Sequence, residues 1–132
     1  MTAEQLTDWF VSTKVAPNLP GGLTISDLAR LFIEEGALHG VKGDLAFAQS
    51  IIETGSFTEF KGANFSGIGV CDSCEGGYLF DSARAGVRAQ MQLLRSYADP
   101  TSRAANLPVP LSPVLYGTDP VDAARRFDTF FL

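Results

Sequence analysis

The chain of 132 residues has no cluster of basic side chains and no long apolar run. Its 10 Lys and Arg residues are outnumbered by 15 Asp and Glu, and the net charge is −5. Nucleic acids and anionic membranes attract basic proteins, so this balance argues against both as partners. No segment approaches the ~20 apolar residues that a membrane-spanning helix needs. The start, "MTAEQLTDWF", lacks the basic and apolar regions of a signal peptide, so export would depend on another part of a longer protein or on a partner.

Cysteine and histidine are scarce as well. The sequence contains Cys71 and Cys74, within "CDSC", and one histidine, His39. A structural zinc site needs more ligands than these. The glycine-rich flanks do not match the strand and helix that surround a redox C-x-x-C motif. The pattern therefore favours a small loop clip or two idle thiols over zinc or redox chemistry, His39 is expected to be an exposed helix-end residue, and no metal or cofactor is expected.

The remaining sequence is dominated by apolar residues at helical spacing. Apolar residues make up 45% of the chain and charged residues 19%, as in ordinary globular proteins, and the length predicts a single domain over residues 1–132. Capping residues and periodicity predict helices within five segments, namely 2–14, 24–40, 42–55, 81–100 and 119–132. The expected N-terminal caps are Thr2, Thr24 or Ser26, and Asp81 or Ser82, and the expected C-terminal stops are Gly40 and Gly55.

Two of these regions differ in character. The helix over residues 43–54 is apolar nearly all round, so it is expected to be the central, buried helix, with Leu45, Phe47, Ala48, Ile51 and Ile52 in the core. Residues 56–81 are rich in glycine and have no helical period, which indicates a loop or a short β-hairpin. An irregular segment of this length in a small domain is usually functional. The predicted fold is mainly α with a small loop or β-hairpin lobe.

An acid ends the apolar helix. Glu53 is followed at once by Thr54 and Gly55, so its side chain would stand at a helix terminus and face the glycine-rich segment. An apolar setting would favour the protonated carboxyl that a general acid uses near neutral pH. The alternative from the spacing alone is an exposed, solvated and idle helix-end carboxylate.

Three blocks around this acid occur in a recognisable order. They are Ala48-Gln49-x-x-x-Glu53-Thr54-Gly55, then Asn64-x-x-Gly67-Ile68, then Phe80 and a long helix that ends in Tyr97-Ala98-Asp99-Pro100. Over roughly residues 25–100, this set resembles the glucosaminidase family of peptidoglycan hydrolases. The resemblance implies a lysozyme-like, mostly helical fold. It also implies cleavage of the β-1,4 bond after N-acetylglucosamine in the glycan strand, with Glu53 as general acid.

The sequence departs from the family pattern at three places. Gly69-Val70 stands where a lysine commonly follows the Gly-Ile pair, and Ser56 intervenes before Phe57. The segment "YGTDPVDAA" has Asp122 where the family carries an active-site tyrosine. The chain also stops on the apolar run "FDTFFL". The chain is therefore expected to be a piece of a longer protein, cut before the true tyrosine motif.

Glycoside hydrolysis usually requires a second carboxylate. Asp72 and Glu75 flank the cysteine pair and are candidates for this role, as is Glu59 in the same irregular segment. A base-activated water or the acetamido group of the substrate stays open as an alternative.

Sugar binding commonly uses aromatic rings and amide groups. The candidates for substrate binding are Gln49, Asn64, Phe65 and Tyr78, whereas Phe57 and Phe80 are expected in the core. Tyr78 is the best candidate for a cleft because its hydroxyl can reach a sugar. Asn64 has an alternative role in fixing the turn before Gly67.

These expectations favour a peptidoglycan hydrolase that acts on the bacterial cell wall, as part of a phage lysin, a tail-associated enzyme or a secreted autolysin. An anionic cell wall repels an acidic protein, so a separate wall-binding module is expected in the full-length protein. Two alternatives remain. One is a non-catalytic glycan-binding or structural module of a phage tail or secretion apparatus. The other is a lytic transglycosylase or muramidase that acts on the neighbouring linkage.

Overall fold

The computed structural model describes residues 1–69 and 77–129. Across these residues the chain forms six α-helices, a short 3-10 helix and no strand. The elements are α1 (Ala3–Ser12), α2 (Ile25–His39), α3 (Gly43–Thr54), α4 (Ala83–Ala98), η1 (Ala104–Asn106), α5 (Pro113–Tyr116) and α6 (Pro120–Asp128). The predicted mainly α fold is confirmed.

The expected β-hairpin is not present in the described part of residues 56–81. Two backbone hydrogen bonds join the two legs of this segment, from the Tyr78 N–H to the Ile68 carbonyl (3.0 Å) and from the Phe80 N–H to the Gly62 carbonyl (2.6 Å). Two isolated bonds do not make a ladder, because several of the intervening residues lie in turns and glycines take left-handed conformations there. The described part of this lobe is therefore a loop, which is the other of the two predicted forms.

Local capping fixes the helix ends as predicted. The side chains of Thr2, Thr24 and Ser82 each accept a hydrogen bond from a backbone N–H in the first turn of α1, α2 and α4. Each such cap stabilises its helix by about 1 kcal/mol. Gly40 and Gly55 end α2 and α3 in the left-handed conformation, with φ of 65° and 56°. Glycine adopts this conformation without steric cost, which is why both helices end there.

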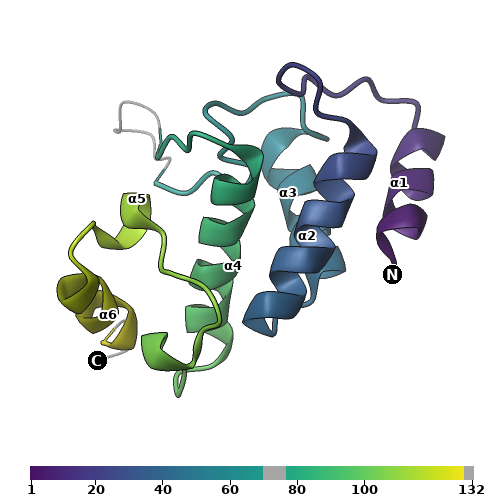
Figure 1. Cartoon of the computed structure of the whole chain (residues 1–132). Coiled ribbons are helices and arrows are strands. Elements are labelled where there is room, and N and C mark those ends of the chain that lie inside the picture. Colours follow the sequence, from purple (N-terminus) through teal and green to yellow (C-terminus); the bar gives the residue numbers. More distant parts are fainter. Residues whose placement is uncertain (70–76, 130–132) are drawn as a thin grey trace.

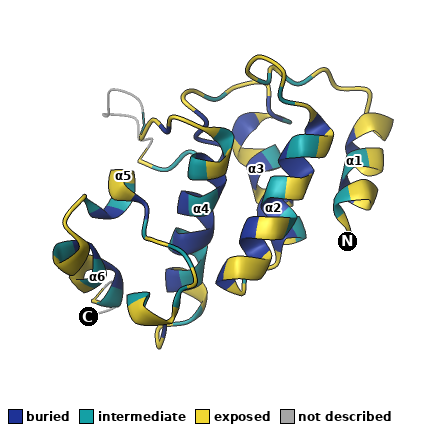
Figure 2. Ribbon diagram, in the orientation of Figure 1, coloured by how far each residue is buried: buried dark blue, intermediate teal, exposed yellow. Residues whose placement is uncertain are grey.

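The helices pack as one body around α2 and α4. In Figure 1, α2 lies between α1 and α4, and α5 and α6 lie beyond α4 on the side away from α1. Figure 2 shows buried residues concentrated along α4 and along the inner sides of the neighbouring helices. A cluster of phenylalanine rings fills the core between α1, α2 and α3, with ring centroids 5.3 to 6.5 Å apart, and it contains Phe10, Phe32, Phe47, Phe57 and Phe65. Phe57 and Phe80 are buried, as predicted.

The prediction that α3 is buried on all sides is wrong. Leu45 is 65% exposed and Ile52 is 81% exposed, although Phe47 on the opposite side is only 1% exposed. α3 packs against the protein through one side, so its other apolar residues are left facing solvent. This outward face of α3 also carries Gln49 and Glu53, which are both exposed.

Two glycines allow backbone segments to come unusually close. A Cβ at Gly43 would lie 2.3 Å from the carbonyl oxygen of Phe32, and a Cβ at Gly86 would lie 1.9 Å from the carbonyl oxygen of Ala63. Both distances are far below van der Waals contact, so no other residue fits without moving the backbone. Gly43 thus sets the spacing of α3 and α2, and Gly86 brings the loop after Ala63 against α4.

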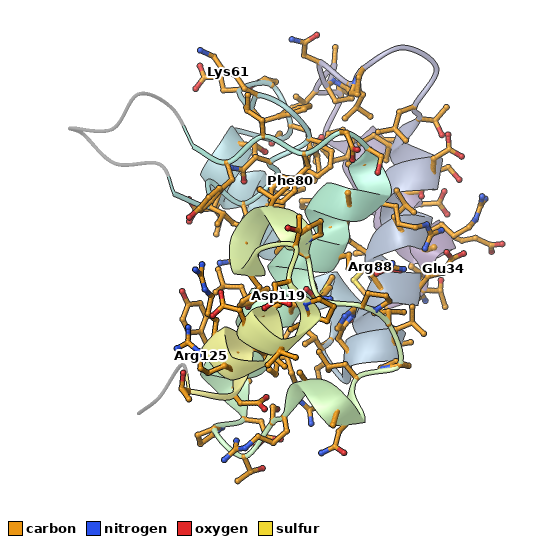
Figure 3. All side chains as sticks on the ribbon, turned by 60° about the vertical axis from the view of Figure 1, so that its left-hand side comes forward. Glu34, Lys61, Phe80, Arg88, Asp119 and Arg125 are labelled. Atoms are coloured by element: carbon orange, nitrogen blue, oxygen red, sulfur yellow. The ribbon has the colours of Figure 1, made fainter. Side chains whose placement is uncertain are left out.

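A buried carboxylate joins α2 to α4. Glu35 is fully buried and accepts hydrogen bonds from Arg88 Nε at 2.6 Å and from Arg84 Nη1 at 2.9 Å. Burial alone would raise the pKa of Glu35, but the hydrogen bonds and charges of the two arginines hold it below its ordinary value. Arg84 also binds the exposed Glu34 at 2.8 Å. Figure 3 labels Glu34 and Arg88 on the side of the molecule where these two helices meet.

His39 is buried, which corrects the expectation of an exposed helix-end residue. Its side chain is 2% exposed, and Nδ1 donates a hydrogen bond to the carbonyl of Glu35 at 2.8 Å. Burial lowers the pKa of His39, because the charged imidazolium would lose its hydration. α4 covers the last turn of α2 here, and Arg95 of α4 lies 3.3 Å from the His39 carbonyl.

We expect the free energy of unfolding to fall as the pH drops below the ordinary His39 pKa of 6.5. Below that pH the unfolded chain binds a proton that the folded chain binds more weakly, so protonation favours unfolding. A His39→Gln variant, which cannot titrate, should lose this dependence. Urea unfolding of both proteins between about pH 5 and about pH 8 measures it. Equal pH slopes for the two proteins would contradict the assignment.

Candidate functional site

The end of α3 is held rigidly next to Glu53. The hydroxyl of Thr54 donates to the Ser50 carbonyl at 2.6 Å and accepts from the Phe57 N–H at 2.9 Å. Ser56 and Phe57 take positive φ values of 60° and 61°, which turn the chain sharply and place Phe57 in the core. The helix end that carries Glu53 is therefore fixed by its own hydrogen bonds and by a buried ring.

The Glu53 side chain is exposed and faces the loop that carries the second motif block. A Cβ at Gly67 would lie 3.5 Å from Glu53 Oε2. Gly67 also has a φ of +67°, which other residues adopt only under strain. Glycine at this position leaves the carboxylate open to a ligand from the side of the loop. The apolar setting expected for Glu53 is not present in the free protein.

Asn64 organises the loop that faces Glu53. Its side-chain Nδ2 donates to the carbonyls of Ile68 (2.8 Å) and Tyr78 (2.9 Å), and its Oδ1 accepts from the Ile68 N–H (2.9 Å). The residue is 5% exposed. With both ends of its amide engaged by backbone, Asn64 ties the Gly67 loop to the segment of Tyr78. This arrangement fits the turn-fixing role better than direct contact with a sugar.

Two cavities adjoin at this loop. One, of about 520 Å³, is lined by Glu53, Glu59 and Lys61 together with residues of the loop, and the other, of about 530 Å³, is lined by Gln49, Gln90 and Arg126 together with Tyr97 and Tyr116. Gly67 and Tyr78 line both cavities, which therefore adjoin, and we call the two together the α3 groove. Figure 3 shows Lys61 at the surface near one end of the molecule.

The sequence-predicted binding residues divide into two groups. Gln49 and Tyr78 line the α3 groove, and Tyr78, which is 44% exposed, packs its ring over Gly69. Phe65 is 1% exposed and contacts Phe57 and Phe60, with ring centroids 6.0 and 4.9 Å apart. The structure thus places Phe65 in the core, where a sugar does not reach it.

Glu59 lies in the same cavity as Glu53. It is exposed and is therefore free to act on a water molecule or a ligand. The other two candidates for a second carboxylate, Asp72 and Glu75, lie outside the described residues, and so does the Cys71–Cys74 pair that they flank. Among the described acids, Glu59 is the one that shares a cavity with Glu53.

Sequence reasoning missed a buried amide behind the groove. Gln90 of α4 is 2% exposed, and its Nε2 donates to Ser50 Oγ at 3.0 Å and to the Ala46 carbonyl at 3.2 Å. The same nitrogen lies 3.5 Å from Oε1 of Gln49, a groove residue. The signal in the sequence was a glutamine on the apolar side of α4, because a buried amide needs partners.

Arg126 was missed as well, because α6 is distant from the motif blocks in the sequence. It lines the groove opposite Gln49, and its Nε pairs with Asp122 at 2.9 Å. Asp122 also pairs with Arg125, so this single carboxylate faces two guanidinium groups. Arg126 thus brings a guanidinium group to the α6 side of the groove, and no periodicity within α6 could have placed it there.

The described residues contain no group of three or more His, Cys, Asp or Glu side chains that could hold a metal ion. None of the helices within residues 1–69 and 77–129 has the length and apolar character needed to traverse a lipid bilayer.

Comparison with known proteins gives one relative and no family. No family model and no solved structure matches the chain. An uncharacterized protein of Borreliella burgdorferi is 32% identical over 89 residues, which cover 63% of this chain and 43% of that protein. The chain thus spans less than half the length of this relative.

Proposed function

We propose that this chain is the catalytic part of a peptidoglycan hydrolase. It cleaves the β-1,4 bond after N-acetylglucosamine in the glycan strand, and Glu53 is its general acid. The proposal rests on the sequence resemblance to the glucosaminidase family and on one observation: the Glu53 carboxylate lines an open cavity and faces Gly67 of the second motif block. Two blocks that are separate in the sequence thus meet at the acid.

The α3 groove suits a carbohydrate chain. It spans two adjoining cavities, and its lining combines the exposed amide of Gln49 with the ring of Tyr78. Amide groups hydrogen-bond to sugar hydroxyls, and an aromatic ring packs against the apolar face of a pyranose. The exposed fraction of Tyr78, 44%, leaves its ring and hydroxyl accessible to such a ligand.

In the proposed reaction, a glycan strand lies in the groove with the scissile oxygen next to Glu53. Glu53 donates a proton to the leaving oxygen as the bond from the anomeric carbon breaks. Glu59 of the same cavity activates the incoming water, unless the acetamido group of the substrate takes this part.

The second candidate function is a non-catalytic glycan-binding or structural module. The exposure of Glu53 in the free protein favours it, because a catalytic acid usually has a more enclosed setting. In either case the site of action is the bacterial cell wall. The net charge of −5 makes a separate wall-binding module part of the proposal.

Product analysis tests the proposal. Purified peptidoglycan is incubated with the protein, and the fragments are identified by mass spectrometry. We expect fragments that end in reducing N-acetylglucosamine. Fragments with reducing N-acetylmuramic acid would move the cut to the other linkage, and anhydro-muramic ends would indicate a lytic transglycosylase. If the protein yields no fragments, the non-catalytic glycan-binding module is the better interpretation.

A further inference from the structure

The α3 groove continues into a third cavity of different chemistry. This cavity, of about 530 Å³, lies toward the start of α3, and it shares Gln49, Leu94 and Tyr97 with the groove. Its other lining residues are mainly apolar and include Val41, Leu45 and Ala98. Lys42 supplies a positive charge to the lining. The third cavity is thus mainly aliphatic, with the ammonium group of Lys42 beside it, whereas the groove is lined by more polar side chains.

We propose that this third cavity, which we call the stem pocket, binds the peptide stem that peptidoglycan carries on its muramic acid residues. This inference rests on the proposed function and specifies its substrate as peptide-bearing glycan. A pyranose has hydroxyl groups on most of its carbons, and an aliphatic lining would leave them without partners. A stem peptide instead offers alanine methyl groups for Leu45 and Leu94, together with carboxylates for Lys42.

The ammonium group of Lys42 is available to a ligand. Within the described residues, Lys42 makes no salt bridge, and the side chain is exposed. Asp44 interacts with the charge of Lys42, but its carboxylate forms its ion pair with the N-terminal amine of Met1, at 2.6 Å. An exposed ammonium group without a salt bridge, beside an apolar cavity, favours a ligand that carries an anionic group next to an apolar part.

The separation of the stem pocket from Glu53 matches the length of a stem peptide. Leu45 precedes Glu53 by eight residues, so the stem pocket begins about 12 Å from the catalytic position along α3, at 1.5 Å per residue. A bond after N-acetylglucosamine has muramic acid on its other side, and the stem starts from that sugar. An extended tetrapeptide spans about 13 Å, so it reaches the pocket while the sugar bond lies at Glu53.

Leu45 has a matched control elsewhere on the surface. Leu45 is 65% exposed on α3, and Val11 is 64% exposed on α1, far from the groove. Lys14, also exposed and near the end of α1, is the corresponding control for Lys42. Exposed apolar side chains that occur singly, such as Val11, need no explanation, whereas Leu45 lines an apolar cavity beside the α3 groove.

Two measurements test the stem pocket. The first is the ratio of kcat/KM for intact peptidoglycan to kcat/KM for glycan stripped of its stems by an amidase. We expect Lys42→Gln to lower this ratio about fivefold, as for loss of one partly exposed ion pair. Leu45→Ser should lower it about tenfold through lost apolar contact. Lys14→Gln and Val11→Ser should leave the ratio unchanged.

The second measurement is binding without turnover. An N-acetylmuramyl tetrapeptide is titrated into the ¹⁵N-labelled protein, with N-acetylmuramic acid as the control ligand. We expect the tetrapeptide, and not N-acetylmuramic acid, to shift the NMR signals of the backbone amides of residues 41–46 and 94–98.

The outcomes separate the stem pocket from the proposed hydrolase. If stripped glycan is cleaved and the kcat/KM ratio is unchanged in Lys42→Gln and Leu45→Ser, the stem pocket is overturned and the proposed hydrolase stands. Tetrapeptide shifts at these residues without any cleavage would overturn the hydrolase and support the pocket. Shifts confined to other residues would overturn the pocket.

Discussion

Replacing Glu53 with glutamine is expected to slow cleavage of peptidoglycan by about 10²- to 10⁴-fold and to leave glycan binding nearly unchanged. The amide has the shape of the carboxyl group but cannot donate a proton to the leaving oxygen. The side chain is exposed and forms none of the contacts that hold the end of α3, which depend on Thr54 and Phe57. The change should therefore remove chemistry without disturbing the fold.

The experiment compares the rate of release of reducing ends by the wild-type protein and by Glu53→Gln, with glycan affinity measured separately. Glu4→Gln removes another exposed acid, from α1, and should retain full activity. Glu59→Gln tests the second carboxylate of the cavity, and a rate loss in this variant would assign Glu59 the water-activating role. Undiminished cleavage by Glu53→Gln would rule out Glu53 as the general acid.

The second large effect concerns stability. Glu35→Gln is expected to lower the free energy of unfolding by about 1.5–3 kcal/mol, since it removes the charge-assisted hydrogen bonds that Arg84 and Arg88 donate to the buried carboxylate. A domain of this size has a total stability of about 5–15 kcal/mol, so the loss would be a large part of it. The carboxylate accepts from both arginines at 2.6 to 3.1 Å, and an amide cannot accept from both in the same way.

The neighbouring acid gives a matched control for this prediction. Glu34 binds the same Arg84, but its side chain is 44% exposed, whereas that of Glu35 is fully buried. Glu34→Gln should cost no more than about 1 kcal/mol, as for a surface ion pair. Urea unfolding at neutral pH measures both changes. Equal losses in the two variants would mean that burial does not determine the strength of this cluster.

The Glu35 cluster also bears on the groove. It fixes the first two turns of α4 against α2, and the following turns of α4 carry Gln90 and Leu94 to the groove, with Leu94 also lining the stem pocket. A loosened α4 would therefore move these two side chains relative to α3. The pH dependence expected for His39 arises at the other end of the same contact, where Arg95 meets the last turn of α2.

The sequence by itself determined the class of fold and the ends of most helices. Thr2, Thr24 and Ser82 begin helices, and Gly40 and Gly55 end them, because caps and left-handed glycines act through neighbouring backbone atoms. The position of Glu53 at the end of α3 followed from the same local rules. The roles of Asp72 and Glu75 stay predictions.

Only the tertiary structure decided which faces are covered. Leu45 and Ile52 are apolar, yet they are exposed because the protein packs against one side of α3. His39 and Glu35 are polar, yet they are buried because α4 supplies arginines and cover from some fifty residues away. The approach of Gly67 to Glu53 depends on Asn64, which ties the Gly67 loop to the segment of Tyr78, and on Gly86, which lets the backbone at Ala63 lie against α4. Such contacts join residues that are far apart in the chain, and no local pattern encodes them.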